Sequence, residues 1–580
     1  MPRMSSLPLP AVPPSRPGAT PVPGPDANVA GGRKRLVIHT GVDTLLLAGS
    51  LYFALAANRL FLGQALQERA LAAPQTWGFA LALLVLLASV HFLLLAPLAN
   101  RYTVKPLLAL LIVTTAFAMH YMQAFGIYVD PSMVRNVLHT DVAEARELFS
   151  WSLLPHLALY VVAPLLLLSR VRIVQRPWLR ASALRVASAL AAIAVLVCTL
   201  LLVFQPLASL MRNHKELRYL ITPANVLWSV AAVGAAQARG AALPRQPIGL
   251  DATLVPAAAG SRPRLLVLVV GETARRANWG LSGYARQTTP ELAHLPVFNF
   301  AHVTSCGTNT ETSVPCMFAP VGRRDYDEAR IRGSESLLHV AAHAGVSVLW
   351  RDNQSGCKGV CDQLPQDEVT ALQPADPCAE GHCLDEGLLA GLEERLAQVA
   401  ASREPTTQLL VLHTLGNHGP SYFRRYPAAF KRFQPACEND DLRLCSRQEI
   451  VNAYDNALLY TDHVLARLVA QLAAADRVDT AMIYVSDHGE SLGENNLYLH
   501  GLPYAIAPDV QTQVPMVMWF SPGLQGALHL DTACLQRRAA EPAAHDHLFH
   551  TVLGVLDVRT ALYEPAWDLT RGCRAPVAAS

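Results

Sequence analysis

Acidic and imidazole side chains follow short apolar runs in the second half of the chain. Glu272 comes just after the run Leu265–Val270, and Asp487 with His488 come just after the run Met482–Val485. Three more histidines stand near the ends of such runs: His413, His418 and His500. Polar groups beyond the carboxyl ends of neighbouring strands meet at one edge of a sheet. Because Asp, Glu and His with an open position form catalytic zinc sites, the pattern predicts such a site.

A hydroxyl-rich segment, residues 305–316, could supply a nucleophile to this site. A bound metal lowers the pKa of a hydroxyl group and aligns it for attack without a neighbouring base. Loops rich in Ser and Thr are usually only loops, so the segment gains weight only beside the acidic and imidazole groups. Spacing leaves four candidates open: Thr308, Thr310, Thr312 and Ser313.

The elements that must position these residues alternate between short apolar runs and helix-like stretches, which is typical of an α/β domain. The predicted strands are Leu265–Val270, Val346–Trp350, Leu409–Leu412 and Met482–Val485. The predicted helices are Leu337–His343, Leu388–Ala401 and Ile450–Leu472. A single Asp-His-Gly would more often be a hydrogen-bonded turn, but several such groups at strand ends are hard to explain as packing.

The first half of the chain has a different composition. The 580 residues are 52% hydrophobic and only 16% charged, whereas soluble proteins carry about 25% charged residues. A membrane part and at least two domains are therefore expected. A net charge of +2 argues against nucleic acid as a partner. Five apolar runs approach the length of a bilayer crossing: 42–62, 77–99, 104–127, 151–169 and 186–204.

Basic residues predict the orientation of these spans, because Lys and Arg are retained in the cytoplasm. Three clusters fall on one side of a five-span arrangement: Arg33, Lys34 and Arg35; Arg101 and Lys105; and Arg170, Arg172, Arg176, Arg180 and Arg185. Residues 130–150 and the chain after about 205 would then face outward. We expect residues 1–32 to be a disordered proline-rich tail, 33–204 the membrane domain, 205–245 an interfacial bridge, and 246–580 the outward catalytic domain.

Ten of the eleven cysteines lie in the outward domain, where an oxidising compartment allows disulfides. Four close pairs and one distant pair are predicted: Cys306 with Cys316, Cys357 with Cys361, Cys378 with Cys383, Cys437 with Cys445, and Cys534 with Cys573. A structural zinc site at Cys357 and Cys361 is the competing interpretation, but a second pair at standard spacing is not present nearby.

A polar face follows the third span. Asn136, Thr140 and Glu144 recur every four residues, so a continuous helix would place them on one side, where they could bind a cationic headgroup. From spacing alone, a solvated surface helix is the favoured interpretation.

The chain as a whole resembles the phosphoethanolamine transferases that modify lipid A, a group that contains the mobile colistin-resistance enzymes. The resemblance extends over nearly the whole chain after the tail, and the catalytic domain of that family is similar to alkaline phosphatases and sulfatases. It rests on five spans and on these motifs: Gly271-Glu272-Thr273, Cys306-Gly-Thr-Asn-Thr, Ser313-Val-Pro-Cys-Met-Phe, Asn417-His-Gly-Pro, Ser486-Asp-His-Gly-Glu-Ser-Leu-Gly-Glu-Asn and Tyr498-Leu-His-Gly.

The resemblance implies roles for individual residues. Thr310 would be the nucleophile, and a zinc ion would be held by Glu272, Thr310, Asp487 and His488. Phosphate or a second zinc would contact Lys358, His418 and His500. The ethanolamine headgroup would be held by Asn136, Thr140 and Glu144. This last role replaces the interpretation of that face as a solvated helix surface. Glu311 departs from the expected small or uncharged residue after the nucleophile, and a carboxylate there could compete for the ethanolamine ammonium or the metal.

The implied function is transfer of phosphoethanolamine from phosphatidylethanolamine to a lipid A phosphate, through a phosphoethanolamine-threonine intermediate, with polymyxin resistance as the consequence. The implied protein is a monomer of the bacterial inner membrane with a cytoplasmic N-terminus and a periplasmic catalytic domain. The alternative is a related transferase with another donor or acceptor, such as a phosphoglycerol transferase or an enzyme that decorates a glycan or protein. Glu144 discriminates, because a neutral or anionic glycerol headgroup has no use for a carboxylate.

Overall fold

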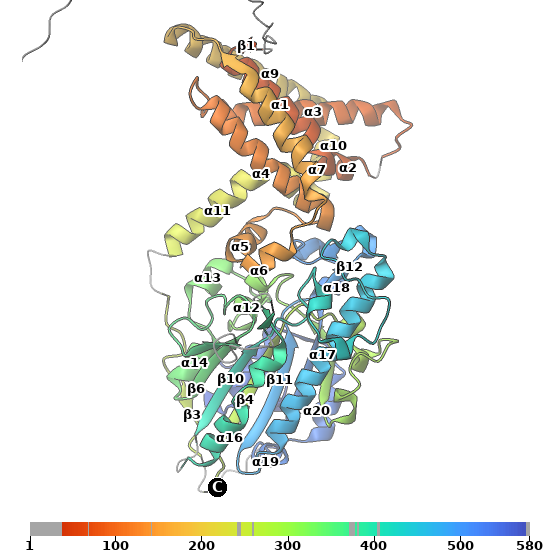
Figure 1. Cartoon of the computed structure of the whole chain (residues 1–580). Coiled ribbons are helices and arrows are strands. Elements are labelled where there is room, and N and C mark those ends of the chain that lie inside the picture. Colours follow the sequence, from red (N-terminus) through yellow and green to blue (C-terminus); the bar gives the residue numbers. More distant parts are fainter. Residues whose placement is uncertain are drawn as a thin grey trace, which may run out of the picture.

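The computed structural model describes residues 37–67, 69–140, 142–240, 245–257, 260–369, 378–379, 382–402 and 406–575. They form a helical part and, beyond it, an α/β part (Figure 1). The predicted order of a helical membrane domain followed by an α/β domain is confirmed. The proline-rich tail and the first basic cluster lie outside the described residues.

The helical part contains the predicted apolar spans. Three helical stretches and one composite are long and apolar enough to cross a membrane: α3 (Pro74–Leu95), α4 (Val104–Phe125), α9 (Trp178–Leu202) and Leu153–Arg170. The last comprises α7 (Leu153–Leu157), a π-helical turn (Ala158–Val162) and α8 (Ala163–Arg170). The first predicted run is bent by 55° between Val42–Ala57 and Arg59–Leu66, so it is a fifth span only if both pieces count together. These pieces are α1 (Val42–Tyr52), a π-helical turn (Phe53–Ala57) and α2 (Arg59–Leu66).

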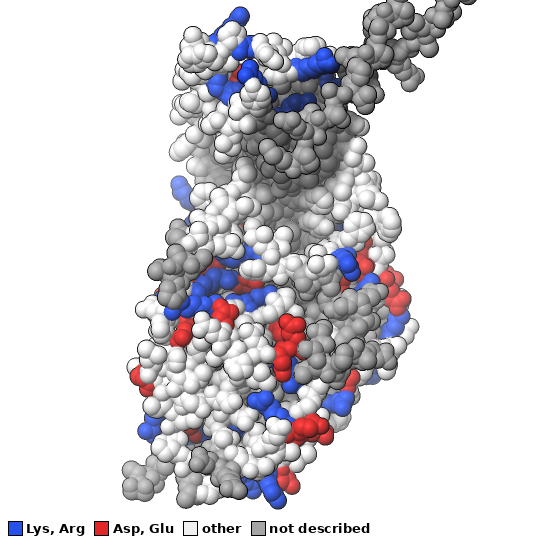
Figure 2. Space-filling view, turned by 60° about the vertical axis from the view of Figure 1, so that its left-hand side comes forward, with Lys and Arg blue, Asp and Glu red and all other residues white. Residues whose placement is uncertain are grey.

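The loops expected on the cytoplasmic side meet at one end of the helical part. Strand β1 (Ile38–Thr40) pairs with β2 (Val171–Ile173), and Lys105 Nζ donates to the Val171 carbonyl at 3.1 Å. The fifth span begins earlier than predicted, so Arg180 and Arg185 lie on α9 rather than in the preceding loop. Arg185 forms an ion pair with Asp43 and donates to the Ala96 carbonyl at 2.6 Å, which ties the helix to this end. In Figure 2, Lys and Arg gather at this end and at the junction with the α/β part, while the described surface between them is nearly free of charge.

Short helices connect the two parts. After the last span come α10 (Phe204–Asn213), a 3-10 helix (Lys215–Leu220) and α11 (Ala224–Gly240). Between α4 and α7 lie α5 (Pro131–His139) and α6 (Val142–Glu147). The continuous helix that would place Asn136, Thr140 and Glu144 on one face is not present, because Thr140 has extended backbone (φ −67°, ψ 129°). Its hydroxyl donates to the Asn136 carbonyl at 2.8 Å, the acceptor that a continuing helix would offer to the Thr140 amide.

The α/β part is built on an eight-stranded sheet with strand order β15-β5-β14-β11-β4-β10-β6-β7. Strands β6, β10, β4 and β11 run parallel, as predicted, but β14 pairs antiparallel with both β11 and β5, so the sheet is mixed. The strands are β4 (Arg264–Gly271), β5 (Phe298–Thr304), β6 (Ser347–Asp352), β7 (Gln366–Glu368), β10 (Thr407–His413), β11 (Asp479–Ser486), β14 (Gln513–Phe520) and β15 (Ala543–Ala544). Small two-stranded sheets pair β3 (Thr253–Leu254) with β16 (Val558–Arg559), β8 (Cys378–Ala379) with β9 (His382–Cys383), and β12 (Ser491–Leu492) with β13 (Tyr498–Leu499).

Alternate side chains of the central strand β4 point into two different cores. Leu266, Leu268 and Val270 pack on one face, and Leu265, Val267 and Val269 on the other, all of them buried. Such uninterrupted apolar strands are typical of a sheet covered on both faces. The helices around the sheet are α12 (Thr310–Met317), α13 (Glu328–Gly333), α14 (Leu337–His343), α16 (Leu392–Ala400), α17 (Arg447–Ala473), α18 (Asp509–Thr512), α19 (Pro522–Ala527), α20 (Thr532–Ala539) and α21 (Asp546–Val555). The predicted helix Leu388–Ala401 begins later, at Leu392, because Gly391 has a positive φ of 67° and ends the preceding turn.

Candidate active site

Glu272, Asp487 and His488 lie together at the carboxyl edge of the sheet. The register of β4 and β11 pairs Gly271 with Ser486, so Glu272 and Asp487 are the next residues on two adjacent parallel strands. All three side chains are fully buried, and their ligand atoms lie within 4.8 Å of one another. The Nε2 atom of His488 is 3.3 Å from Glu272 Oε1 and 3.4 Å from Asp487 Oδ2. The predicted convergence at strand ends is therefore present.

Thr310 presents its hydroxyl to the same group. It is the first residue of α12, where the Asn309 side chain accepts from the Thr312 amide at 3.0 Å and so caps the helix. The Thr310 Oγ1 atom lies 3.1 Å from Glu272 Oε2 and 3.3 Å from His488 Nε2. The positive end of the helix dipole at this position favours an anionic oxygen or an anionic substrate group.

Two of the other hydroxyl candidates donate to backbone carbonyl groups. Thr308 Oγ1 donates to the Leu502 carbonyl at 2.6 Å, and Ser313 Oγ donates to the Asp487 carbonyl. A side chain at Gly307 would lie 3.1 Å from Cγ2 of Thr312, so that methyl group packs against the preceding loop. Among the four residues that spacing left open, the geometry singles out Thr310.

The electrostatics of the cluster favour a cation at its centre. Burial lowers the pKa of His488, but the Asp487 charge and the hydrogen bond to Glu272 outweigh this and raise it to about 10. Burial and the neighbouring charge of Glu272 raise the pKa of Asp487 to about 6. Burial also opposes ionisation of Glu272, but its contacts with His488 hold the pKa of this carboxyl below its ordinary value. The protein alone compensates two buried carboxylates with one protonated imidazole.

The residues present fit a metal ion. Asp487 Oδ2 is buried, has no hydrogen-bond partner among the described residues, and points at the same space as the other donor atoms. Two carboxylates, an imidazole and a hydroxyl are the oxygen and nitrogen donors that zinc accepts. Glu272, Asp487, His488 and Thr310 are thus the residues that would hold such an ion.

A second pair of histidines lies beside this cluster. The ring centroid of His500 is 4.3 Å from that of His488 and 5.6 Å from that of His418. His500 Nδ1 contacts Glu490 Oε2 at 2.8 Å, and the other Glu490 oxygen accepts from Tyr422 at 2.5 Å. Glu490 therefore fixes the orientation of the His500 ring and leaves its Nε2 atom for other contacts.

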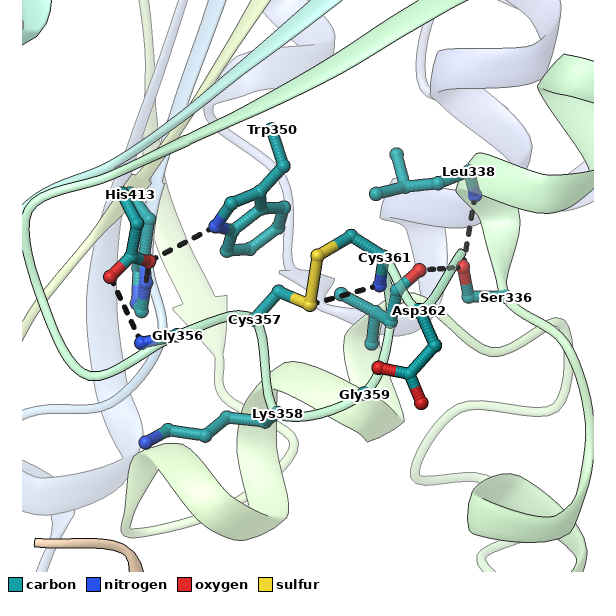
Figure 3. The surroundings of a disulfide bond; sticks show 12 residues. Ser336, Leu338, Trp350, Gly356, Cys357, Lys358, Gly359, Cys361, Asp362 and His413 are labelled. Atoms are coloured by element: carbon teal, nitrogen blue, oxygen red, sulfur yellow. Dashed lines mark hydrogen bonds and ion pairs between the residues drawn. A yellow bond between two sulfur atoms is a disulfide. The ribbon is translucent and has the colours of Figure 1, made fainter. Parts of the chain in front are cut away.

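Lys358 and Glu311 form an ion pair beside Thr310. The Lys358 ammonium is 3.5 Å from Glu311 Oε1 and donates to the Ser355 carbonyl at 2.9 Å. Lys358 lies between Cys357 and Cys361, with its side chain directed away from their disulfide (Figure 3). Glu311 is buried, yet the charges of Lys358, Arg332 and His139 outweigh its desolvation and keep its pKa below the usual range. The Glu311 carboxylate, which was expected to compete for a substrate ammonium, is thus already paired with basic side chains of the protein.

Three comparisons relate this arrangement to known proteins. Residues 87–238 match the family described as phosphoethanolamine transferase EptA/EptB, and residues 264–558 match the sulfatase family. The chain is 38% identical over 550 residues to the phosphoethanolamine transferase EptA of Escherichia coli K12, covering 93% of this chain and 99% of that one. It is 36% identical to the phosphatidylethanolamine transferase Mcr-1 of Escherichia coli, covering 82% of this chain and 89% of that one. The chain belongs to the phosphoethanolamine transferase family.

A solved structure of this family agrees with the whole architecture. The integral membrane lipooligosaccharide phosphoethanolamine transferase A of Neisseria meningitidis superposes with a TM-score of 0.88 at 36% identity, covering 93% of this chain and 100% of that one. The soluble domain of the same protein matches at 44% identity with a TM-score of 0.55. The family resemblance inferred from the motifs is confirmed.

Helix α5 of this transferase lies against the loop that precedes Thr310. Asn309 Nδ2 is 3.5 Å from the Ser132 hydroxyl, and a side chain at Gly501 would meet Met133 Cε at 2.8 Å. Asn136 and Thr140 are half-buried on this segment. The side chain of Glu144 lies outside the described residues, so the predicted headgroup set stays a prediction.

Four of the five predicted disulfides are seen between described side chains. They join Cys306 to Cys316, Cys357 to Cys361, Cys437 to Cys445, and Cys534 to Cys573. The competing zinc site at Cys357 and Cys361 is therefore wrong. Cys383 is disulfide-bonded and stands opposite Cys378 in the β8–β9 register, but the Cys378 side chain lies outside the described residues.

Several residues of the transferase site carry no local motif that sequence reasoning could use. His545 is buried with its pKa lowered to about 4, and it accepts from the Cys306 amide at 3.0 Å and contacts the Ser486 carbonyl at 2.9 Å. Gln354 Nε2 donates to Glu272 Oε2 at 3.3 Å. His413, in contrast, contacts Asp352 through Nδ1 at 2.8 Å, to one side of the Cys357–Cys361 disulfide (Figure 3), and is not among the three grouped donors Glu272, Asp487 and His488.

Proposed function

We propose that the chain transfers phosphoethanolamine from phosphatidylethanolamine to a phosphate group of lipid A, through a covalent intermediate on Thr310. The observation that carries the proposal is the position of the Thr310 hydroxyl, 3.1 Å from Glu272 and 3.3 Å from His488 at the start of α12. Relatives named for phosphatidylethanolamine and lipid A support the choice of donor and acceptor. A zinc ion, when bound by Glu272, Thr310, Asp487 and His488, would lower the pKa of the hydroxyl and offset charge on the phosphoryl oxygens.

The chain's own residues account for two displacement steps. In the first, Thr310 Oγ forms a bond to the donor phosphorus, the bond from phosphorus to the glycerol oxygen breaks, and diacylglycerol leaves with a proton. In the second, an oxygen of a lipid A phosphate forms a bond to the same phosphorus, and the Thr310 oxygen leaves and regains its proton. His418 and His500 are the proton carriers, since their rings lie beside the cluster.

Positioning of the donor falls to residues around the cluster. The Lys358 ammonium, close to the start of α12, would compensate the negative charge of the phosphoryl group or lie beside a second zinc ion with His418 and His500. Asn136, Thr140 and Glu144 would hold the ethanolamine end, and the contact of α5 with the nucleophile loop supports this location. An amide, a hydroxyl and a carboxylate suit an ammonium group better than a glycerol headgroup.

The cellular consequence follows from charge. Each transfer adds an ammonium to lipid A, so the outer surface attracts cationic peptides such as polymyxins less strongly. The gathering of two basic loops at one end of the helical part supports a cytoplasmic location for that end and a periplasmic location for the catalytic domain of an inner-membrane monomer.

Mass spectrometry of lipid A tests the proposal. Cells that express the chain should gain lipid A species heavier by one phosphoethanolamine, and cells that express Thr310→Ala should not. Thr312→Ala is the matched control, because it removes a hydroxyl from the same helix two residues away. If parent protein is present in the membrane and lipid A is unchanged, the assigned acceptor is wrong. If Thr310→Ala modifies lipid A like the parent, the assigned nucleophile is wrong.

A further inference from the structure

Glu311 is a buried carboxylate that joins three elements next to the nucleophile. Its side chain is 1% exposed and lies in the first turn of α12. One of its oxygens is 2.9 Å from His139 Nδ1 and 3.5 Å from Lys358 Nζ, and the other is 3.3 Å from Arg332 Nη2. The partners come from α5, from the loop after β6 and from α13. The helix that carries Thr310 is thereby tied to the membrane part of the chain.

Both oxygens of the Glu311 carboxylate therefore have partners. Arg332 also donates to the Glu311 backbone carbonyl, so the start of α12 is held through side chain and main chain. A carboxylate without partners is costly to bury, whereas one with several cationic partners at hydrogen-bond distance is held in one place. His139 is the last residue of α5, and its contact with Glu311 fixes where that helix ends relative to Thr310.

The far end of the same segment is held in a similar way. Glu147, the last residue of α6, forms an ion pair with Arg425, and both side chains are almost completely buried. Arg425 Nε donates to the His418 carbonyl at 2.7 Å. We call the contacts of Glu311 the first clasp and the Glu147–Arg425 ion pair the second clasp. The first clasp lies beside Thr310, and the second reaches the His418 carbonyl.

We propose that the segment α5–α6 is a positioning element which the catalytic domain grips at both ends, through Glu311 beside the nucleophile and through Arg425 beside His418. The inference rests on the proposed function, because it concerns the register between a membrane-held donor and Thr310. The segment carries the predicted headgroup residues, whereas the nucleophile belongs to a separate domain. The two clasps set the distance between them, and a small displacement of a reacting group lowers the rate steeply.

A double-mutant cycle on the full chain tests the first clasp. His139→Gln, Glu311→Gln and the double variant are compared in nanodiscs that contain phosphatidylethanolamine and lipid A, with diacylglycerol release as the readout. Each single variant should lower kcat/KM by roughly 10- to 100-fold. Because His139 acts through Glu311, the double variant should be no slower than Glu311→Gln alone, whereas independent roles would multiply.

Hydrogen exchange supplies a readout that a general loss of stability would not reproduce. Exchange of the amides of residues 131–147 should rise in His139→Gln, in Glu311→Gln and in Glu147→Gln, while amides of the sheet keep the parent protection. His343→Gln is the matched control, because it removes an imidazole that contacts Glu335 at 2.8 Å away from the site. His139 is 45% exposed in its side chain, so its replacement is tolerated even if the buried Glu311→Gln fails to fold.

The outcomes separate the two levels of inference. A parent protein that releases no diacylglycerol would contradict the proposed function and leave the clasp to be judged by hydrogen exchange alone. An active parent, with His139→Gln and Glu147→Gln unchanged in both rate and exchange of residues 131–147, would overturn the positioning role. Multiplicative losses in the double-mutant cycle would also overturn it.

Discussion

The affinity of the cluster for zinc should depend on pH in a way fixed by His488. Without metal, the charge of Asp487 and the hydrogen bond to Glu272 outweigh burial and raise the pKa of His488 to about 10. The imidazole is therefore protonated at neutral pH and must lose its proton before Nε2 can bind a metal. We expect zinc binding to release this proton, so the apparent dissociation constant should rise as the pH falls.

The magnitude follows from the pKa values. One pKa unit corresponds to about 1.4 kcal/mol, so removing the His488 proton at pH 7 costs about 4 kcal/mol of binding free energy. Between pH 6.5 and 8.5 the dissociation constant should change about tenfold per pH unit. Below about pH 6, where Asp487 also takes up a proton, the dependence should steepen towards about a hundredfold per unit.

Competition with a chelating indicator measures this dependence on the full chain in detergent. The Thr310→Val variant is the suitable background, because it removes turnover and any proton released by the hydroxyl. Calorimetry in buffers of different ionisation enthalpy counts the released protons directly, and about one per zinc is expected at pH 7.5. Adding His488→Gln to this background should weaken binding, because one ligand of the ion is lost. A flat profile with His488 present would refute the electrostatic reasoning.

Three further predictions concern stability. Asn58→Ala should lower the unfolding free energy by about 1–3 kcal/mol, seen as a lower melting midpoint in detergent, because the buried side chain donates to the Phe53 carbonyl at 2.9 Å at the bend of the first span. Asp352→Asn should cost about 2 kcal/mol at neutral pH: burial opposes ionisation, but contacts led by His413 lower the pKa of Asp352 to about 2. This stabilisation is complete above the ordinary pKa and is lost as the pH falls towards 2, so a midpoint difference that does not shrink between pH 5 and pH 3 would contradict it. Replacing the Cys534–Cys573 pair by serines should cost about 4 kcal/mol, against about 2 kcal/mol for Cys357–Cys361, since it closes the longer loop; equal costs by thermal melting would argue against the loop-entropy account.

The parts of the site that could be predicted are those with a local signal. A carboxylate after an apolar run needs only the direction of its strand to be placed at the sheet edge, and the register Gly271 to Ser486 then brings Glu272 next to Asp487. The spans could likewise be located, because a bilayer crossing demands about 20 apolar residues in a row. The start of α9 was missed because Arg180 and Arg185 lie on its first turns, and sequence pattern alone assigns such charges to a loop.

Features that depend on tertiary contacts could not be predicted in this way. Strand β14 carries the same apolar pattern as the parallel strands of the sheet, so its antiparallel direction is decided by the chain connection and not by its residues. The helix break at Thr140 depends on one side-chain hydrogen bond that competes with the helical pattern. His545 lies 44 positions beyond Gly501, the last residue of the quoted motifs, and no motif around it marks it as a residue that supports the site.

The interpretation of Glu311, a carboxylate where a small or uncharged residue was expected, changes once its contacts are known. A carboxylate beside the nucleophile looks like a competitor for the substrate ammonium as long as it is considered alone. Its three partners His139, Arg332 and Lys358 are 172, 21 and 47 positions away in sequence, so no local pattern could reveal them. Because those partners come from α5 and from two separate elements of the α/β part, the Glu311 carboxylate joins the segment that carries the predicted headgroup residues to the helix that carries Thr310.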